Sequence, residues 1–83
     1  MITVEQAIEI AKKNDKYNMR IEGCNDYGSF YAFRIVPAET PIGEAVGGVG
    51  PYCVDKTTGE FSIPYFADLL TLDAKKIDIS DLI

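Results

Sequence analysis

The strongest structural signal in the sequence is the alternating, aromatic-rich segment Ser29–Val36. Successive residues of a strand point to opposite faces, so an extended chain here places Tyr31, Phe33 and Ile35 on one side. We expect this side to face the core, which requires a fold in which a sheet packs against a second layer. The other side would hold Phe30, Ala32, Arg34 and Val36.

A helix is predicted near the start of the sequence. Thr3 and Gln6 have the spacing of a capping box, in which the threonine hydroxyl accepts from the first turn and the glutamine reaches back to the cap. The helix should begin at about Val4 and stop at Asn14-Asp15. Its apolar stripe, which we expect to lie across one face of the sheet, consists of Val4, Ala7, Ile8 and Ala11.

The first of two predicted hairpins precedes the aromatic strand. A strand beginning at Tyr17 shows the same alternation, and the turn-forming segment Gly23–Gly28 would join it to Ser29–Val36. The segment Pro37–Gly50 contains two prolines and four glycines, which predicts a loop, although Glu44–Val49 has the composition to begin another strand.

The second predicted hairpin joins Tyr52–Asp55 to Phe61–Ile63 through Lys56–Glu60. Glycine adopts the left-handed backbone conformation that such a short loop needs at its end. The residues to which we assign a structural turn role are Gly48, Gly50, Pro51, Asp55 and Gly59.

Together these elements predict a single α+β domain over residues 1–83. An N-terminal helix packs on a four-stranded antiparallel meander, and the outline is cystatin-like. The tail Pro64–Ile83 is rich in apolar residues and should pack on the rest of the chain, but its pattern does not assign a structure.

The chain is acidic, with a net charge of −5 and a pI near 4.5. Its eight Lys and Arg residues are dispersed apart from two adjacent pairs. Binding to a phosphate backbone requires a basic patch, so nucleic acid is not an expected partner. An acidic surface instead favours encounter with a basic protein, because long-range attraction raises the association rate.

The sequence also bears on the location of the protein. The stretch Met1–Ile10 has neither the basic start nor the continuous apolar run of a signal peptide, and the longest apolar runs are too short to cross a membrane. We therefore expect a cytoplasmic protein without a membrane partner. In that compartment Cys24 and Cys53 are most simply buried thiols rather than a disulfide.

The sequence contains no histidine, which removes the usual nucleophile activation and histidine-based zinc sites. Neither cysteine belongs to a C-x-x-C pair, and Gly47–Gly50 lacks the Lys-Ser/Thr of a phosphate-binding loop. No two of the carboxylates are marked as an acid-base pair. We therefore expect no catalytic residue, no metal site, no cofactor and no enzymatic activity.

One segment carries a resemblance to a known family. In Gly48–Glu60 a G-x-G-P element leads to V-D-x-x-T-G, and this resembles the late hairpin of the bacterial polymorphic-toxin immunity proteins classed as immunity protein 35. The resemblance implies a cytoplasmic protein that neutralises a toxin by masking its active surface, a role that needs no catalytic residue. It carries over no named binding residue, and the V-D-x-x-T-G motif is also similar to one in PepSY-like domains.

Two alternatives therefore stay open beside the immunity protein. One is a PepSY-like or cystatin-like protease inhibitor or regulatory domain whose glycine-rich segment enters a protease cleft. The other is a structural module that forms a homodimer through a sheet edge. For the immunity role we place the partner contact on the loop Pro37–Val46 and its surroundings, with Glu39, Thr40, Glu44 and Tyr52 as contact residues.

Overall fold

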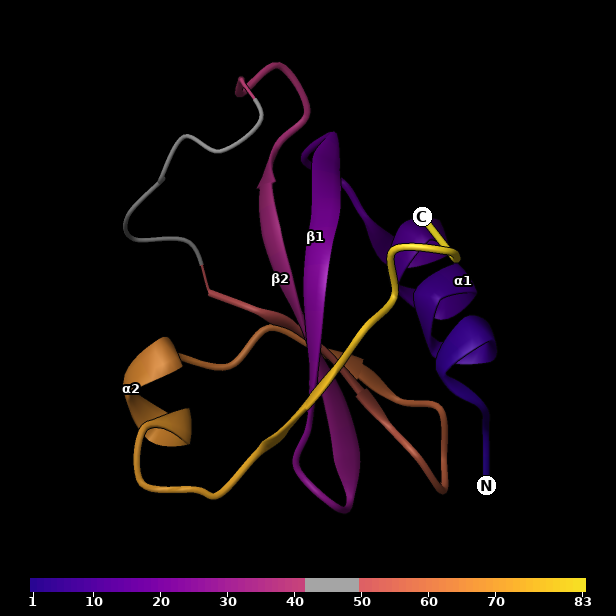
Figure 1. Ribbon diagram of the computed structural model, residues 1–83, viewed down its shortest axis with the longest axis vertical. Coiled ribbons are helices and arrows are strands. Elements are labelled where there is room, and N and C mark those ends of the chain that lie inside the picture. Colours follow the sequence, from indigo (N-terminus) through magenta and orange to yellow (C-terminus); the bar gives the residue numbers. More distant parts are fainter. Residues whose placement is uncertain (42–49) are drawn as a thin grey trace.

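The structure is a computed structural model, which describes residues 1–41 and 50–83. In chain order the elements are α1 (Val4–Asn14), β1 (Met19–Asp26), β2 (Phe30–Pro37), β3 (Tyr52–Asp55), β4 (Phe61–Ser62), α2 (Phe66–Leu69) and β5 (Lys75–Ile77). In this described part five strands form one antiparallel sheet in the order β4-β3-β2-β1-β5, and Figure 1 shows β1 and β2 side by side. The predicted α+β fold with an N-terminal helix on a meander is confirmed, and the tail adds a fifth strand.

Helix α1 begins and ends where the sequence predicts. The Gln6 amide donates to Thr3 Oγ1 (3.2 Å) and the Thr3 amide donates to Gln6 Oε1 (2.8 Å), which completes the capping box. Such a cap contributes about 1 kcal/mol to helix stability. Ala7, Ile8 and Ala11 are buried against the sheet, where α1 contacts β2, β3 and β4.

The turn of the first hairpin is shorter than predicted. We expected Gly23–Gly28 to form it, but β1 continues to Asp26 and the reversal is confined to residues 27–29, with Gly28 at φ 92°. The last three residues of β1 pair with β2 on one side and with β5 on the other. A register shift between Ile21 and Gly23 marks a bulge that accommodates the glycine within the strand. The prediction was wrong because the second pairing comes from the distant tail, which local turn propensity does not reveal.

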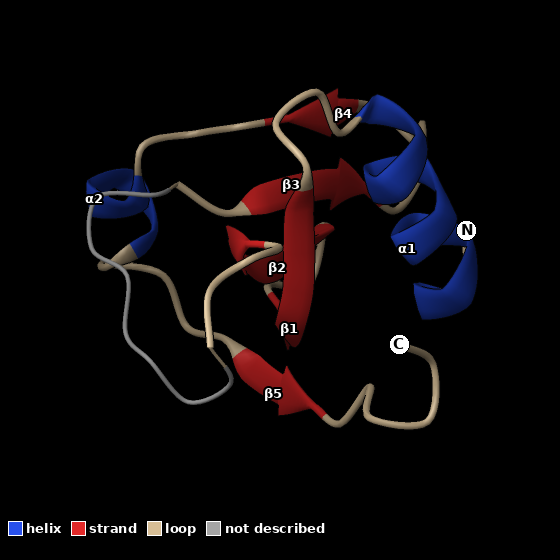
Figure 2. Ribbon diagram, turned by 90° about the horizontal axis from the view of Figure 1, so that it is seen from above, coloured by secondary structure: helices blue, strands red, loops and turns tan. Residues whose placement is uncertain are grey.

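Apolar side chains cover both faces of the sheet. Tyr31, Phe33 and Ile35 are buried in one cluster with the apolar stripe of α1, which confirms the predicted core side of β2. On the other face Ala32 forms a smaller cluster with buried residues of β3 and α2. Figure 2 shows the two helices on opposite sides of the sheet. Helix α2 therefore gives the second face a partial cover.

The two cysteines lie on opposite faces of the sheet. Cys24 pairs with Phe33 in the ladder and belongs to the α1 cluster, whereas Cys53 pairs with Ala32 and belongs to the α2 cluster. Both are free and buried, as predicted. Since a disulfide needs two Cβ atoms about 3.5–4.5 Å apart, side chains that leave a sheet in opposite directions cannot form one.

The tail crosses the molecule from α2 to the opposite edge of the sheet. After α2 the chain runs to β5, which pairs with β1, and the remaining residues return toward α1 (Figure 1). Ile79 is buried, and Ile77 and Leu82 pack against the same cluster as α1. The tail therefore completes one side of the main core. Within the described residues, no helix has the length and apolarity that crossing a membrane would take.

Candidate functional site

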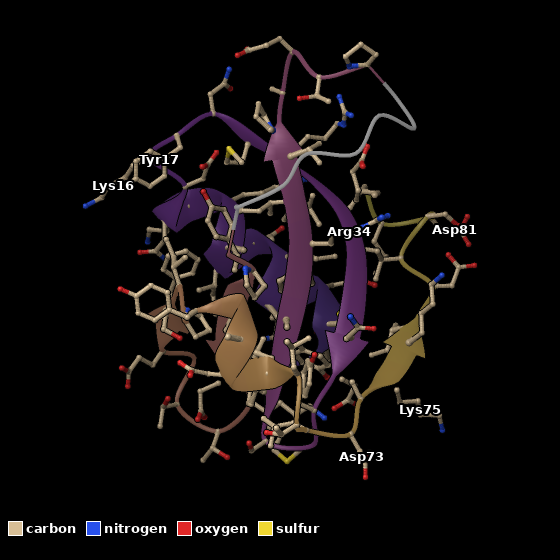
Figure 3. The ribbon with its side chains drawn as sticks, turned by 90° about the vertical axis from the view of Figure 1, so that its left-hand side faces the viewer. Lys16, Tyr17, Arg34, Asp73, Lys75 and Asp81 are labelled. Atoms are coloured by element: carbon tan, nitrogen blue, oxygen red, sulfur yellow. The ribbon has the colours of Figure 1, made fainter. Side chains whose placement is uncertain are left out.

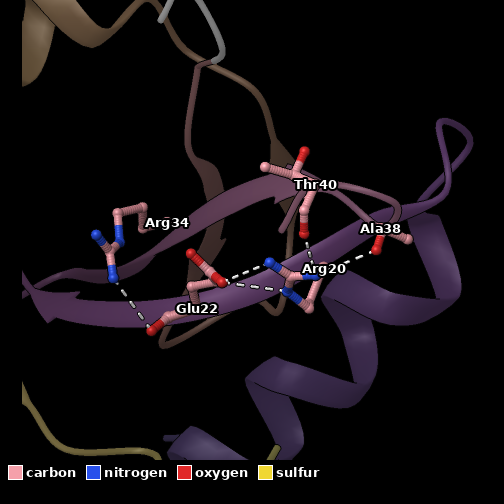
Figure 4. A network of polar contacts seen from close by, with 5 residues as sticks. All are labelled: Arg20, Glu22, Arg34, Ala38 and Thr40. Carbon is pink, nitrogen blue, oxygen red and sulfur yellow. Dashed lines mark hydrogen bonds and ion pairs between the residues drawn. The ribbon is translucent and has the colours of Figure 1, made fainter. Parts of the chain in front are cut away.

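The predicted contact residues that the structure describes differ in their exposure. Glu39 is exposed and Thr40 is half-buried just after β2, whereas Glu44 lies outside the described residues. Arg20 fixes the backbone here by donating to the carbonyl oxygens of Ala38 (3.1 Å) and Thr40 (2.9 Å), as Figure 4 shows. It also forms an ion pair with Glu22 at 2.7 Å. The first residues after β2 are thus held in place by a β1 side chain.

Tyr52 belongs to the core. It is 2% exposed, its ring packs edge-on against Phe61 at a centroid distance of 5.1 Å, and its hydroxyl donates to Asp15 Oδ1 at 2.5 Å. A side chain with so little surface has almost nothing to offer a partner. We therefore leave Tyr52 out of the contact surface and assign it a structural role.

Asp15, which accepts the hydrogen bond from the Tyr52 hydroxyl, joins three elements. Asp15 ends α1 and accepts hydrogen bonds from the amides of Tyr17 (3.1 Å) and Met19 (2.9 Å) as well as from Tyr52. Burial raises the pKa of Asp15, but these hydrogen bonds outweigh that effect and leave the pKa below its ordinary value. The carboxylate is therefore ionised at neutral pH and ties α1, β1 and β3 together.

The V-D-x-x-T-G motif, one of the two on which the family resemblance depends, forms the second hairpin. Asp55 Oδ1 accepts from the amides of Thr57 (2.8 Å) and Thr58 (2.9 Å), which lowers the pKa of Asp55. Gly59 has φ 74°, the left-handed conformation that the sequence predicts. These motif residues thus stabilise the backbone of the hairpin in which they lie.

The other assigned turn residues lie just before β3. A Cβ added at Gly50 would meet the carbonyl oxygen of Pro64 at 2.8 Å, so the close approach of the two chain segments needs a glycine. Pro51 is buried, and Gly48 lies outside the described residues.

Lys56 links the two hairpins from inside the protein. Its side chain is 9% exposed, its Nζ lies 2.6 Å from Asp26 Oδ1, and the same atom sits 4.7 Å from the centroid of the Tyr31 ring. The hydrogen bond from Lys56 is the main cause that lowers the pKa of Asp26, with the Gly28 amide adding to it. This cation is fully engaged in holding the fold.

A hollow of about 300 Å³ opens on the α1 face of the sheet. Its walls are mainly apolar, and its charged residues are of both signs: Lys12 and Arg20 are basic, and Asp15 is acidic. Asp15 and Arg20 are already bound within the protein by the contacts described above. The other residues around this hollow are Ala11, Met19, Ile21, Ala38, Tyr52 and Ile83.

A second hollow, of about 420 Å³, lies on the opposite face beside α2. Its charges are all of one sign, because Asp55, Glu60 and Asp68 line it and no Lys or Arg does within the described part of the chain. Its remaining lining residues are Phe30, Cys53, Ser62, Pro64, Leu69 and Leu72.

Large apolar side chains are exposed in the same segment of the chain. Tyr65 is 82%, Leu70 67% and Leu72 48% exposed; Tyr65 and Leu70 directly flank α2, and Leu72 follows three residues after its end. Figure 3 views the molecule from the side on which α2 lies in front of the sheet. We call the hollow and these neighbours the α2 surface, defined by Phe30, Asp55, Glu60, Tyr65, Asp68, Leu69, Leu70 and Leu72.

The α2 surface does not have the features of a metal or thiol site. Among residues 1–41 and 50–83, no group of three or more Cys, Asp or Glu side chains is arranged to hold a metal ion. Burial raises the pKa of the Cys53 thiol at the floor of the hollow to about 11, so it is protonated and unreactive at neutral pH. What the surface offers is apolar contact area and negative charge.

Sequence reasoning missed this surface because most of it lies in the unassigned tail. The available signal was the run Tyr65–Leu72, whose five large apolar residues exceed what four residues of helix can bury. No protein-family model, curated protein or solved structure matches the chain.

Proposed function

We propose that the protein is a non-catalytic protein-binding domain that acts as a bacterial immunity protein, neutralising a toxin by masking it. The observation that carries the proposal is the α2 surface, where exposed apolar side chains adjoin an acidic hollow. An apolar patch with a polar rim is typical of a surface that another protein covers. The exposed tyrosine supports this reading, because tyrosine is enriched at interfaces.

The charge of the chain favours a basic partner. The net charge is −5, and the carboxylates of the α2 surface concentrate part of it beside the apolar contact area. Opposite charge on the partner would speed its encounter with the protein, and the apolar side chains would supply most of the affinity. This combination would serve toxin masking, which requires no catalytic group.

The loop after β2 remains a second proposed contact. Glu39 is exposed there, and Figure 1 shows the end of β2 in the upper part of the molecule and α2 in its lower half. Glu39 and the α2 surface are thus separate parts of the surface. We propose that Glu39 and Glu44 act as steering charges and that the α2 surface makes the tight contact.

The cystatin-like or PepSY-like inhibitor stays a prediction, because the glycine-rich segment that it would insert lies mostly outside the described residues. The homodimer finds less support. A homodimer formed through a sheet edge would have to use β4, which has two residues, or β5, which carries Lys75 and Lys76. Short edge strands and edge lysines are features by which proteins prevent such pairing.

Affinity capture tests the proposal. The tagged protein is incubated with lysate of the cells in which it naturally occurs, and the bound proteins are identified by mass spectrometry. The molar mass of the purified complex is then measured by light scattering. We expect a protein with a toxin domain in a 1:1 complex. Recovery of untagged copies of the chain alone, with a dimer mass in light scattering, would contradict the immunity role and favour the homodimer.

A further inference from the structure

We propose that the α2 surface binds a basic segment of the partner in which one large apolar side chain is flanked by Lys or Arg residues. This inference rests on the proposed protein-binding function and names the part of the partner that the surface recognises. The supporting observation is the lining of the hollow, to which separate elements contribute apolar side chains and carboxylates.

Both apolar side chains and carboxylates line the hollow. Phe30 from β2, with Leu69 and Leu72 from the α2 segment, lines it with apolar atoms. Asp55 and Glu60 approach from the β3–β4 hairpin, whereas Asp68 comes from α2. An apolar side chain placed in the hollow would thus meet carboxylates that come from two separate elements.

Two of these carboxylates are available to a partner. Glu60 and Asp68 form no ion pair within residues 1–41 and 50–83, and residues 42–49 contain no Lys or Arg that could supply a cation to them. Asp55 already accepts two backbone amides, so it contributes mainly its charge. Cationic side chains of a partner would pair with Glu60 and Asp68.

The size of the hollow limits what it can admit. A volume of about 420 Å³ is near the lower end of the range of about 300–1,000 Å³ found for binding pockets. It suits a single anchoring side chain, in the manner of an interface hot spot. Tyr65 and Leu70, which follow the lining residues Pro64 and Leu69 in the sequence, are more exposed and offer further apolar contact area.

The hollow on the α1 face provides an internal comparison. It is also apolar, but Lys12 and Arg20 line it together with Asp15. Because it has charges of both signs, it does not favour a basic segment over an acidic one. The partner chemistry named above therefore fits the α2 surface and not the other hollow.

Peptide titration monitored by amide chemical shifts of the full chain tests the inference. The probe is acetyl-Lys-Lys-Phe-Lys-Lys-amide, and the comparison peptides replace Phe by Ser or all Lys by Glu. We expect the probe to shift amides around the α2 surface, with at least tenfold weaker binding of the Ser and Glu peptides. Equal binding of the Phe and Ser peptides, or no shift at millimolar probe, would overturn the proposed anchor.

A matched pair of variants localises the effect. Glu60→Gln/Asp68→Asn removes the two available carboxylates, and Glu9→Gln/Asp81→Asn removes the same charge from α1 and from the tail, where Asp81 lies away from α2 (Figure 3). We expect about tenfold weaker probe binding in the first variant, since it removes two exposed ion pairs with the probe, and less than twofold change in the second. Equal losses would show that only net charge matters and would overturn the site.

This test separates the inference from the proposed function. If the captured toxin binds Glu60→Gln/Asp68→Asn as tightly as the original protein, the α2 surface is the wrong site although the binding function stands. If no protein is captured but the peptides discriminate as expected, the site stands and the immunity role fails.

Discussion

Replacing Tyr52 by phenylalanine removes one buried hydroxyl and leaves the rest of the core in place. The ring keeps its contact with Phe61, and the change deletes only the hydrogen bond of 2.5 Å to Asp15. A hydrogen bond to a charged group contributes about 1.5–3 kcal/mol. Asp15 keeps the two backbone amides that it accepts from, so no buried acceptor is orphaned, and we expect a loss of about 1.5–2 kcal/mol.

Thermal unfolding followed by circular dichroism measures this loss. In a domain of this length 1 kcal/mol corresponds to about 4–8 °C, so Tyr52→Phe should lower Tm by about 6–16 °C at pH 7. The pKa of Asp15 is lowered in the folded state, so the contribution of this carboxylate is complete above its ordinary pKa of about 3.9 and is lost as the pH falls through the folded value. The difference between the two proteins should therefore shrink below about pH 4.

Tyr17→Phe is the control, because Tyr17 is 69% exposed and its hydroxyl forms no hydrogen bond to the described residues. It should change stability by less than about 0.5 kcal/mol. An unchanged Tm for Tyr52→Phe at pH 7, or a decrease that stays the same on acidification, would refute the role given to the pair.

Three further predictions concern the fold. Gly50→Ala should lower the free energy of unfolding in urea by about 1–3 kcal/mol, because its Cβ would meet the Pro64 carbonyl oxygen at 2.8 Å. Gly23→Ala is the control, because its Cβ meets only the flexible Arg34 side chain at 3.4 Å. Equal effects of the two substitutions would contradict this packing. In the native protein Cys24 and Cys53 should resist a thiol reagent that labels both after denaturation, since burial raises their pKa values to about 12 and about 11; rapid native labelling would argue against their burial. Stability should fall as the pH drops below about 4, because the folded state binds protons more weakly than the unfolded state wherever a carboxyl pKa is lowered. The carboxyl groups with lowered pKa values are those of Asp15, Asp26, Asp55 and Asp78. A free energy of unfolding that does not change with acidification would contradict these lowered pKa values.

Local patterns in the sequence were enough to predict α1, the core side of β2 and the second hairpin. Each depends on residues close together in the chain, such as the capping pair Thr3 and Gln6 or Gly59 at the end of its loop. These signals involve backbone hydrogen bonds and side-chain alternation that hardly depend on distant partners. The helix-on-meander fold can therefore be predicted from the sequence alone.

The features that the sequence did not predict depend on contacts between distant segments. Gly23–Asp26 resembles a turn but is extended, because β5 pairs with it from about fifty residues away. Tyr52 was chosen as a contact residue although the register places it opposite Phe33, on the core face. Tyr52, Cys53 and Val54 form a continuous apolar run, and this run was the signal that β3 is buried on both faces.

The candidate site was missed for a similar reason. Leu69 is buried only because α2 folds back on Ala32 and Cys53, which lie on other elements. Glu60 and Asp68 are eight positions apart in the sequence and come from different elements, so no local motif joins them. Their role becomes visible only when the tail is placed on the sheet.

Growth rescue tests the central claim, neutralisation by masking, most directly. The captured partner is expressed from an inducible promoter in a host that it inhibits, together with the original chain, Glu60→Gln/Asp68→Asn or Glu9→Gln/Asp81→Asn. The account predicts that the original chain and the Glu9/Asp81 variant restore growth and that the Glu60/Asp68 variant restores it poorly at equal expression. Continued growth arrest in the presence of the original chain, with the complex demonstrably formed in the same cells, would contradict the claim.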